Sequence, residues 1–201
     1  MRLPYVPDPP PNTTPDEAAI VERIRVRRAP RPLTVLDRAL LHSPAVADGW
    51  NTFMGAIRTR TSLPADIREL AISRVAAINC AWYEWKHHAP LAVAPGGVAL
   101  EVVRGPAVAD GTRPLRIGDE DAELRRGLDD RQWAALVYAD EMTRNVRVSD
   151  ETFARLRELF SVKEIVELTA TISSYNGVSR FLVALDIGEM NDSEQDLSLS
   201  H

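Results

Sequence analysis

The sequence predicts an all-α protein, and three observations point to this class. Apolar residues recur every three or four positions along most of the chain, which is the period of a helix with one buried face. Alternation of apolar and polar residues, the pattern of a strand, is rare. Helix-start signals also precede the apolar stretches, most clearly the capping box formed by Ser161 and Glu164.

The chain begins with a proline-rich stretch, residues 1–15, which contains six prolines. Proline fixes the backbone φ angle and removes a hydrogen-bond donor, so this stretch is predicted to be an extended arm. The arm is either a disordered tail or a segment laid over a neighbouring subunit. Its apolar residues Leu3, Tyr5 and Val6 could take part in such docking.

Helices are predicted to fill most of the remaining chain. They cover, in chain order, residues 16–28, 34–41, 44–60, a central helix that starts at 63–64, then 81–94, 98–104, 128–145, 150–160 and 162–187. Their periodicity predicts that a set of large apolar residues faces the core. This set includes Ile20, Val46, Trp50, Phe53, Met54, Ile57, Trp133, Phe153 and Leu156.

Two features interrupt this pattern. Pro90 lies inside the stretch 81–94 and predicts a kink or a restart, because proline lacks the N–H and crowds the preceding turn. Residues 95–127 are rich in glycine and proline, and they predict a long loop that is either a lid or disordered. The predicted domain plan is the arm, a single helical domain over 16–190 and a polar tail over 191–201.

Composition excludes several classes of function. The formal net charge of -5 at pH 7 argues against nucleic acid as the main partner. The single cysteine, Cys80, rules out an internal disulfide and suits a reducing compartment. No apolar run reaches the roughly 18 residues that a membrane span needs. We therefore expect a cytoplasmic protein that binds neither membrane nor nucleic acid.

One acid stands in an otherwise apolar stretch of the central helix. Between Leu70 and Ala81 the only charge is Arg74, so this helix is predicted to be buried nearly all round. Burial disfavours the charged form of a carboxylate, which is how proteins prepare a general acid or base. Glu69 is therefore a candidate proton carrier, unless it only pairs with an arginine such as Arg180.

Four ionisable side chains follow within six residues. Glu84 and His88 are four positions apart and face the same side of a helix, so Glu84 is predicted to orient the His88 imidazole. Tyr83 and His87 form a second pair, rotated by about 100° from the first. Alternatively, these pairs are surface contacts of an ordinary helix. No metal site is predicted, because adjacent histidines diverge and no further ligand cluster follows.

At these residues the sequence resembles the carboxymuconolactone decarboxylase and alkylhydroperoxidase D-like family. The matching segments are LPADIREL, SRVAAIN, WYEWKHHAPLA, the glycine turn at 96–97 and the final helix ELTATISSYNGVSRFLVALDI. The resemblance covers residues 40–190. It implies an alkylhydroperoxidase D-like helical bundle with a long C-terminal helix, assembled as a homo-oligomer (a dimer, trimer or hexamer) with a site near subunit contacts.

The resemblance also implies a relay of an acid, a C-x-x-C dithiol and a histidine. The acid falls on Glu69 and the histidine on His88, but the two cysteine positions hold Ala81 and Glu84. Cys80 is one position early, which turns it about 100° away on a helix. One thiol cannot close the catalytic disulfide, so the chain fits the family's non-redox branch, whose members act on small carboxylated lactones or related rings by proton transfer without a cofactor.

We therefore predict a cofactor-independent enzyme that performs acid–base chemistry (decarboxylation, isomerisation or lactone chemistry) on a small carboxylated or cyclic metabolite. Two rival functions are a non-catalytic helical oligomer that binds or scaffolds, and a peroxidase-like antioxidant activity through Cys80. Tyr83 is predicted to bind a developing oxyanion, and Arg74 is an alternative to Arg180 for holding a substrate carboxylate. The predicted catalytic residues are Glu69, Tyr83, Glu84 and His88, and the predicted substrate-binding residues are Trp82, Trp85, His87 and Arg180.

Overall fold

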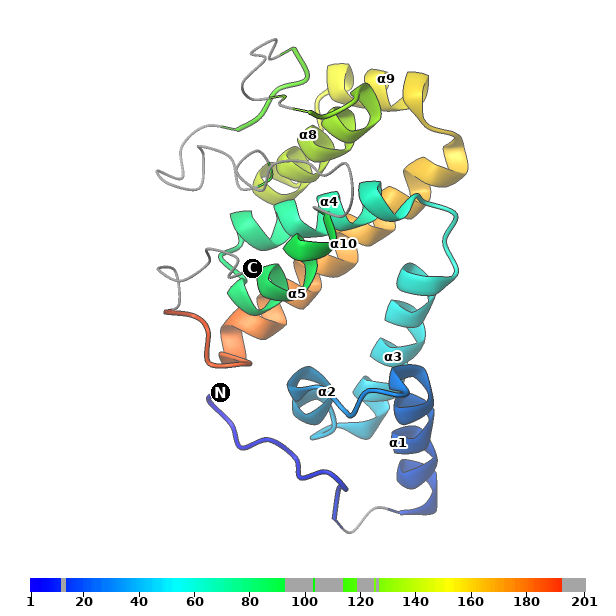
Figure 1. Ribbon diagram of the computed structural model, residues 1–201, viewed down its shortest axis with the longest axis vertical. Helices are drawn as coiled ribbons and strands as arrows, with labels where there is room; N and C mark the ends of the chain where they lie inside the picture. Colours follow the sequence, from blue (N-terminus) through cyan, green and yellow to red (C-terminus); the bar gives the residue numbers. More distant parts are fainter. Residues whose placement is uncertain (12–13, 93–102, 104–113, 119–124, 126, 193–201) are drawn as a thin grey trace. The chain divides into compact units, whose positions relative to one another are not determined.

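Helices make up the regular structure of the computed structural model, which describes residues 1–11, 14–92, 103, 114–118, 125 and 127–192. Within these ranges there are eight α-helices and no strand, which confirms the predicted all-α class (Figure 1). None of these helices is both long and apolar enough to cross a membrane. The helix expected at 98–104, most of the loop 95–127 and most of the tail 191–201 lie outside the described residues.

The chain divides into two compact units, and the first comprises Met1–Thr61 with Ala184–Met190. The prediction of a single domain over 16–190 stays a prediction. Within the first unit, α1 and α2 each pack against α3. The helices of this unit are α1 (Pro15–Arg28), α2 (Val35–Leu40) and α3 (Pro44–Thr59).

Local hydrogen bonds start and join the first two helices. Thr34 forms a capping box with Asp37 at the start of α2: the Asp37 N–H donates to Thr34 Oγ1, and the Thr34 N–H donates to Asp37 Oδ2. The same Asp37 carboxylate accepts two bonds of 2.8 Å from the Arg28 guanidinium at the end of α1. This bidentate pair fixes α2 against the end of α1.

The proline-rich arm is held by its own unit. The Arg2 N–H donates to Leu185 O at 2.8 Å, and the Val6 N–H donates to Arg38 O at 3.3 Å. The Tyr5 hydroxyl donates to Glu189 at 3.1 Å. Residues 1–11 form neither helix nor strand, and they make hydrogen bonds within their own chain.

Part of the predicted core is exposed. On α3, Met54 and Ile57 are buried, but Val46 and Phe53 are 52% and 51% exposed. Phe153 in the second unit is 43% exposed. The prediction that these three residues are buried was wrong, because a helix buries only the part of its apolar face that a neighbouring helix covers.

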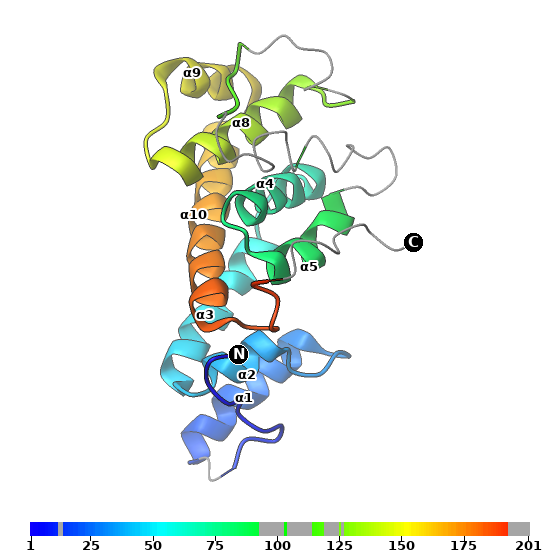
Figure 2. The ribbon, with the colours of Figure 1, turned by 90° about the vertical axis from the view of Figure 1, so that its left-hand side faces the viewer.

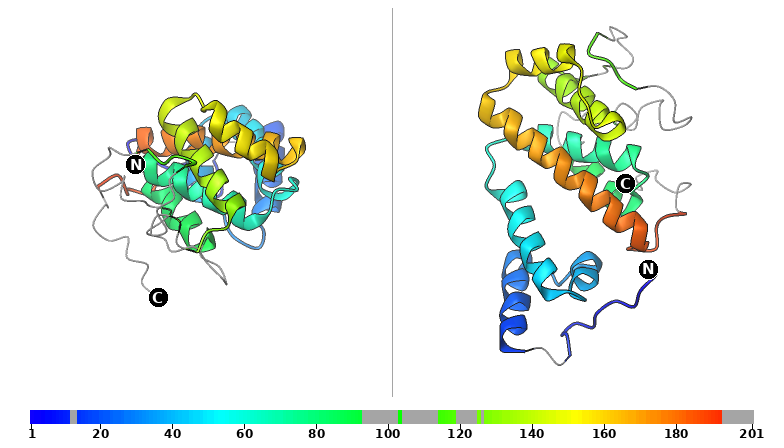
Figure 3. Two further views of the ribbon diagram at one scale, coloured as in Figure 1. Left: turned by 90° about the horizontal axis from the view of Figure 1, so that it is seen from above. Right: turned by 180° about the vertical axis from the view of Figure 1, so that it is seen from behind.

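The second unit, Ser62–Val183 with Asn191–His201, carries five helices in its described residues. α4 packs against both α5 and α8, and α8 packs against α9. α10 lies beside α4 and α5 in the three figures (Figures 1, 2 and 3), and side-chain hydrogen bonds join it to α5 and to Asn79, the residue that follows α4. These helices are α4 (Ala65–Ile78), α5 (Trp82–Ala92), α8 (Asp130–Asn145), α9 (Asp150–Leu159) and α10 (Val162–Leu185).

Side-chain caps begin three of these helices, one of which the sequence analysis predicted. The Glu164 N–H donates to Ser161 Oγ and the Ser161 N–H donates to Glu164 Oε2, which is the predicted capping box of α10. Asp129 caps α8 and Ser149 caps α9 in the same way, through N–H groups of the first turn. Pro90 neither ends nor restarts α5, which continues through it to Ala92.

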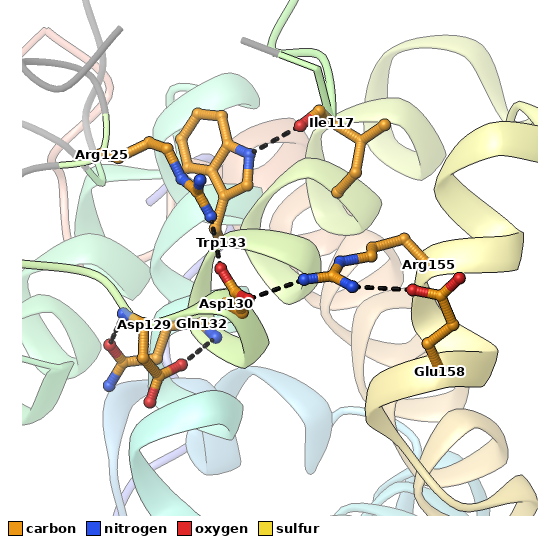
Figure 4. Close-up of polar contacts among 8 residues, drawn as sticks. All are labelled: Ile117, Arg125, Asp129, Asp130, Gln132, Trp133, Arg155 and Glu158. Atoms are coloured by element: carbon orange, nitrogen blue, oxygen red, sulfur yellow. Dashed lines mark hydrogen bonds and ion pairs between the residues drawn. The ribbon is translucent and has the colours of Figure 1, made fainter. Parts of the chain in front are cut away.

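The start of α8 is tied to its surroundings by a polar network (Figure 4). Asp130 accepts hydrogen bonds from Arg125 at 2.9 Å and from Arg155 of α9 at 2.7 Å. Nearby, the Trp133 indole N–H donates to Ile117 O at 3.3 Å. The network therefore anchors α9 and two described points of the segment between α5 and α8 to the first turns of α8.

A fully buried ion pair joins α4 to the middle of α8. Neither Arg74 nor Asp140 is exposed, and Arg74 Nε donates to Asp140 Oδ1 at 3.0 Å. Arg74 also donates to Val103 O, and Asp140 accepts from the Leu115 N–H and from Arg144. Burial lowers the pKa of the Arg74 guanidinium, and the Asp140 carboxylate opposes this effect.

Replacing Asp140→Ala is expected to lower the free energy of unfolding by about 3–5 kcal/mol, because it leaves the Arg74 charge buried without its carboxylate. Urea denaturation followed by circular dichroism measures this loss. The matched control is Asp48→Ala, which removes the partner of Arg23 in a pair that is 53% exposed on the Arg23 side and 33% on the Asp48 side. It is expected to cost much less than Asp140→Ala, because water screens the charges of an exposed pair. Equal losses in the two variants would contradict the role of burial.

Candidate active site

Helix α4 places one carboxylate in an apolar setting. Every residue from Glu69 to Ala77 is buried, as the sequence predicted, because α5 and α8 both pack on this helix. The Glu69 residue is 4% exposed. A carboxylate at such a place needs partners to replace its water.

Glu69 has a histidine on one carboxylate oxygen and an arginine on the other. His88 Nδ1 of α5 lies 2.6 Å from Glu69 Oε2, and Arg68 Nε lies 3.3 Å from Glu69 Oε1. The His88 side chain is 13% exposed and the Glu69 side chain 5%. The suggested pairing of Glu69 with an arginine is therefore present, although the arginine is Arg68 and not Arg180, and Glu69 also contacts His88, which the sequence had paired with Glu84.

A tyrosine from the last helix completes the surroundings of His88. The rings of His88 and Tyr175 of α10 meet edge to face, with their centroids 5.0 Å apart. Sequence reasoning missed Tyr175. One feature of the sequence could have pointed to it. Tyr175 and Ser179 are polar residues four positions apart on an otherwise apolar helix, the same spacing as Glu84 and His88.

The Glu84 carboxyl does not bind His88, contrary to the prediction from their spacing. Its Oε2 accepts a 2.9 Å hydrogen bond from the Ser179 hydroxyl of α10, and its Oε1 has no hydrogen-bond partner within the described ranges. The Glu84 residue is 2% exposed. Burial raises the pKa of Glu84 well above its ordinary value, and the Ser179 bond opposes this only in part.

Tyr83 and His87 form a pair of their own on α5. Their ring centroids are 4.4 Å apart, and His87 Nδ1 lies 2.7 Å from the Tyr83 backbone oxygen. His87 is exposed and Tyr83 is half-buried. The structure therefore brings Tyr175 to His88, whereas it places the predicted oxyanion ligand Tyr83 against His87.

The remaining predicted residues differ in their surroundings. Trp82 and Trp85 are buried on α5, and no described residue forms a hydrogen bond with the Trp85 indole N–H. The exposed Arg180 donates to Asn176 of its own helix. Arg74 is engaged by Asp140, so it does not serve as the alternative carboxylate-binding residue.

The two positions at which the family resemblance would place cysteines hold Ala81 and Glu84, so no thiol pair is present there. Ala81 is buried, whereas Cys80 is exposed at a backbone φ of +51° between α4 and α5. Within the described residues, no group of three or more His, Cys, Asp or Glu side chains is arranged to hold a metal ion.

The predicted family resemblance is confirmed. Residues 44–112 match the model of the carboxymuconolactone decarboxylase family. This segment contains α4, α5 and the Glu69–His88 pair. Among curated proteins, none matches the chain.

A solved structure shares the fold. It is the crystal structure of the debrominase Bmp8, an alanine-for-cysteine variant in complex with 2,3,4-tribromopyrrole. The two chains are 16% identical, the alignment covers 89% of each, and the TM-score is 0.59. At this identity the similarity establishes the common fold alone.

The raised pKa of Glu84 predicts how stability changes with pH. The folded protein keeps this proton at pH values where the unfolded chain has lost it, so wild-type stability falls as pH rises above the ordinary glutamate range. The Glu84→Gln variant has no titratable carboxyl at this position, so its stability does not carry this pH dependence. Urea denaturation should therefore show the variant gaining on the wild type by up to about 1.4 kcal/mol per pH unit above about pH 4 until the folded carboxyl titrates.

Glu164→Gln is the matched control of opposite sign. Hydrogen bonds from the Ser161 backbone N–H and hydroxyl lower the pKa of Glu164. Its contribution to stability is therefore present above the ordinary glutamate range and is lost as pH falls. The wild type should gain on this variant as pH rises through the acid range. A pH-independent difference between wild type and Glu84→Gln would contradict the assignment of a raised pKa.

Proposed function

We propose that this chain, whose residues 44–112 match the carboxymuconolactone decarboxylase family, is an enzyme that uses the Glu69–His88 pair to move protons on a small carboxylated or cyclic metabolite. The observation that carries the proposal is the 2.6 Å contact between His88 Nδ1 and Glu69 Oε2. A carboxylate beside an imidazole, partly shielded from water, is the usual arrangement of a general base and the group that orients it.

The contact assigns the proton of the neutral imidazole. An ionised Glu69 carboxylate can only accept hydrogen bonds. With Glu69 ionised, His88 Nδ1 therefore carries the imidazole proton and donates a hydrogen bond to Glu69. The lone pair then lies on Nε2, which becomes the basic nitrogen. When Nε2 takes up a proton, the nearby Glu69 carboxylate stabilises the imidazolium that forms.

A single proton carrier suffices for the proposed reactions. His88 Nε2 removes a proton from the carbon next to a carbonyl or lactone group, and the electron pair moves onto the oxygen. Return of the proton to another carbon completes an isomerisation. In a decarboxylation, the C–C bond breaks to release carbon dioxide, and His88 in its protonated, imidazolium form delivers the Nε2 proton to the carbanion that remains. The buried Trp82 and Trp85 keep this part of α5 apolar.

Arg68 is the residue that we assign to a substrate carboxylate, in place of Arg180 and Arg74. Its Nε is bound to Glu69, and the side chain is 15% exposed. Terminal guanidinium nitrogens bind carboxylates in bidentate geometry. A carboxylate held by Arg68 would lie beside the Glu69–His88 pair.

The fold neighbour supports a cyclic ligand, since that debrominase was crystallised with 2,3,4-tribromopyrrole, a small ring. The proposed assembly as a homo-oligomer follows from the family resemblance.

A scaffold function and a peroxidase function through Cys80 are the rivals. The scaffold rival does not require the Glu69–His88 contact, and the peroxidase rival requires Cys80.

Replacing His88→Ala or Glu69→Gln is expected to lower kcat by about 100-fold or more, because each change removes the base or the carboxylate that orients it. Turnover and deuterium exchange with solvent, measured on a panel of carboxylated butenolides, provide the test. The controls are Lys86→Ala, an exposed cation on α5, and Cys80→Ser. Both controls should retain wild-type turnover. Full activity in both site variants would rule out the proposed function.

Replacing Arg68→Ala is expected to raise KM for carboxylated substrates by about 10- to 100-fold, which corresponds to about 1.5–3 kcal/mol for a charged hydrogen bond. The methyl esters of the same substrates serve as the internal control, since they lack the anion. Their KM should change little. If acid and ester suffer equally, Arg68 acts on Glu69 and not on the substrate.

A further inference from the structure

The buried carboxyl of Glu84 has a chemical environment opposite to that of Glu69. Glu69 meets an imidazole and a guanidinium, whereas Glu84 has one hydrogen-bond partner among the described residues, the hydroxyl of Ser179. Its second oxygen, Oε1, is buried and has no partner in the described part of the chain. No lysine, arginine or histidine forms an ion pair with Glu84 among the described residues.

Such a site does not suit an ionised carboxylate. A buried anion needs several donors or a cation to replace its hydration, and one hydroxyl supplies a single hydrogen bond. A protonated carboxyl fits this environment better. In the protonated acid the 2.9 Å contact, in which the Ser179 hydroxyl donates to a carboxylate, can reverse so that the O–H on Oε2 donates to Ser179 Oγ. Oε1 is then a neutral carbonyl oxygen, for which a missing partner costs much less than for a charged one.

The Glu84–Ser179 bond lies one helical turn from the base. Glu84 precedes His88 by four residues on α5, and Ser179 follows Tyr175 by four residues on α10. The 2.9 Å Glu84–Ser179 bond and the edge-to-face His88–Tyr175 contact are therefore successive links between the same two helices.

We propose that Glu84 is a positioning residue, kept as a neutral carboxylic acid, whose bond to Ser179 holds α5 against α10 and thereby seats His88 on Tyr175. Its second effect is electrostatic: Glu69 is left as the carboxylate that acts on His88. For the role in catalysis the proposal rests on the proposed function. The neutral state and the seating of His88 do not depend on it.

The electrostatic effect matters because a base must be able to lose its proton. The ionisable groups around His88 are Glu69 of α4 with its Arg68 partner, Glu84 and His87 of α5, and Tyr175 of α10. A second anion one turn away would stabilise the imidazolium further. His88 would then stay protonated over a wider pH range and would abstract protons less readily.

The test of the neutral state is the titration of His88, followed by NMR on histidine-labelled protein. The His88 signal is identified by its loss in His88→Ala. Removing a real charge at about 6 Å changes the titration midpoint by about half to two pH units. We expect Glu69→Gln to lower the midpoint by such an amount and Glu84→Gln to leave it in place. An equal lowering by Glu84→Gln would show that Glu84 is ionised and would overturn the proposal.

The test of positioning uses the ring signals of His88, which sense the nearby Tyr175 ring. Glu84→Leu and Ser179→Ala should each shift these signals, and Glu84→Gln, whose amide can still donate to Ser179, should restore them. Thermal unfolding of each variant is recorded in parallel. If Glu84→Leu lowers Tm but leaves the His88 signals in place, the bond serves stability alone and the proposal fails. Neither measurement needs a substrate, so these results stand apart from the turnover tests of the proposed function.

Discussion

The requirement that a buried carboxylate find partners governs the second unit. Glu69 lies on a helix that is buried along nearly its whole length from that residue onward, so water cannot satisfy its oxygens. His88 from α5 and the adjacent Arg68 do so instead. The Glu69 contact thus helps to join α5 to α4 and orients the His88 imidazole.

The two glutamates show how environment gives one residue type two roles. Glu69 is matched with an arginine and a histidine and suits the ionised state. Glu84 has a single hydroxyl, and burial raises its pKa. Carboxyl groups in such different environments are a common basis for dividing roles within one site. Here the two environments differ because Glu69 of α4 meets His88 of α5 and Arg68, whereas α10 offers Glu84 of α5 a single serine hydroxyl.

Much of the fold could be predicted from local sequence signals. The capping boxes of α2, α8 and α10 depend on residues three positions apart, and these positions mark the helix starts that the structure shows. Burial was harder to predict. Phe53 has the apolar character of a core residue but is half-exposed, because the neighbouring helix covers only part of the α3 surface. Arg74, which the sequence offered as a ligand for substrate, is instead the buried partner of Asp140 on a distant helix.

The sequence by itself determined the helical class, the main helix starts, the burial of Glu69 and the family pattern that singles out His88. Each of these is encoded within a few turns of one helix or in the order of residues along it. Only the tertiary structure decided the partners: Glu69 and not Glu84 on His88, Tyr175 and not Tyr83 beside it, and Ser179 on Glu84. The reason is physical. Residue spacing specifies which side chains share a helix face, but which helix meets that face depends on the packing of elements up to 95 residues apart.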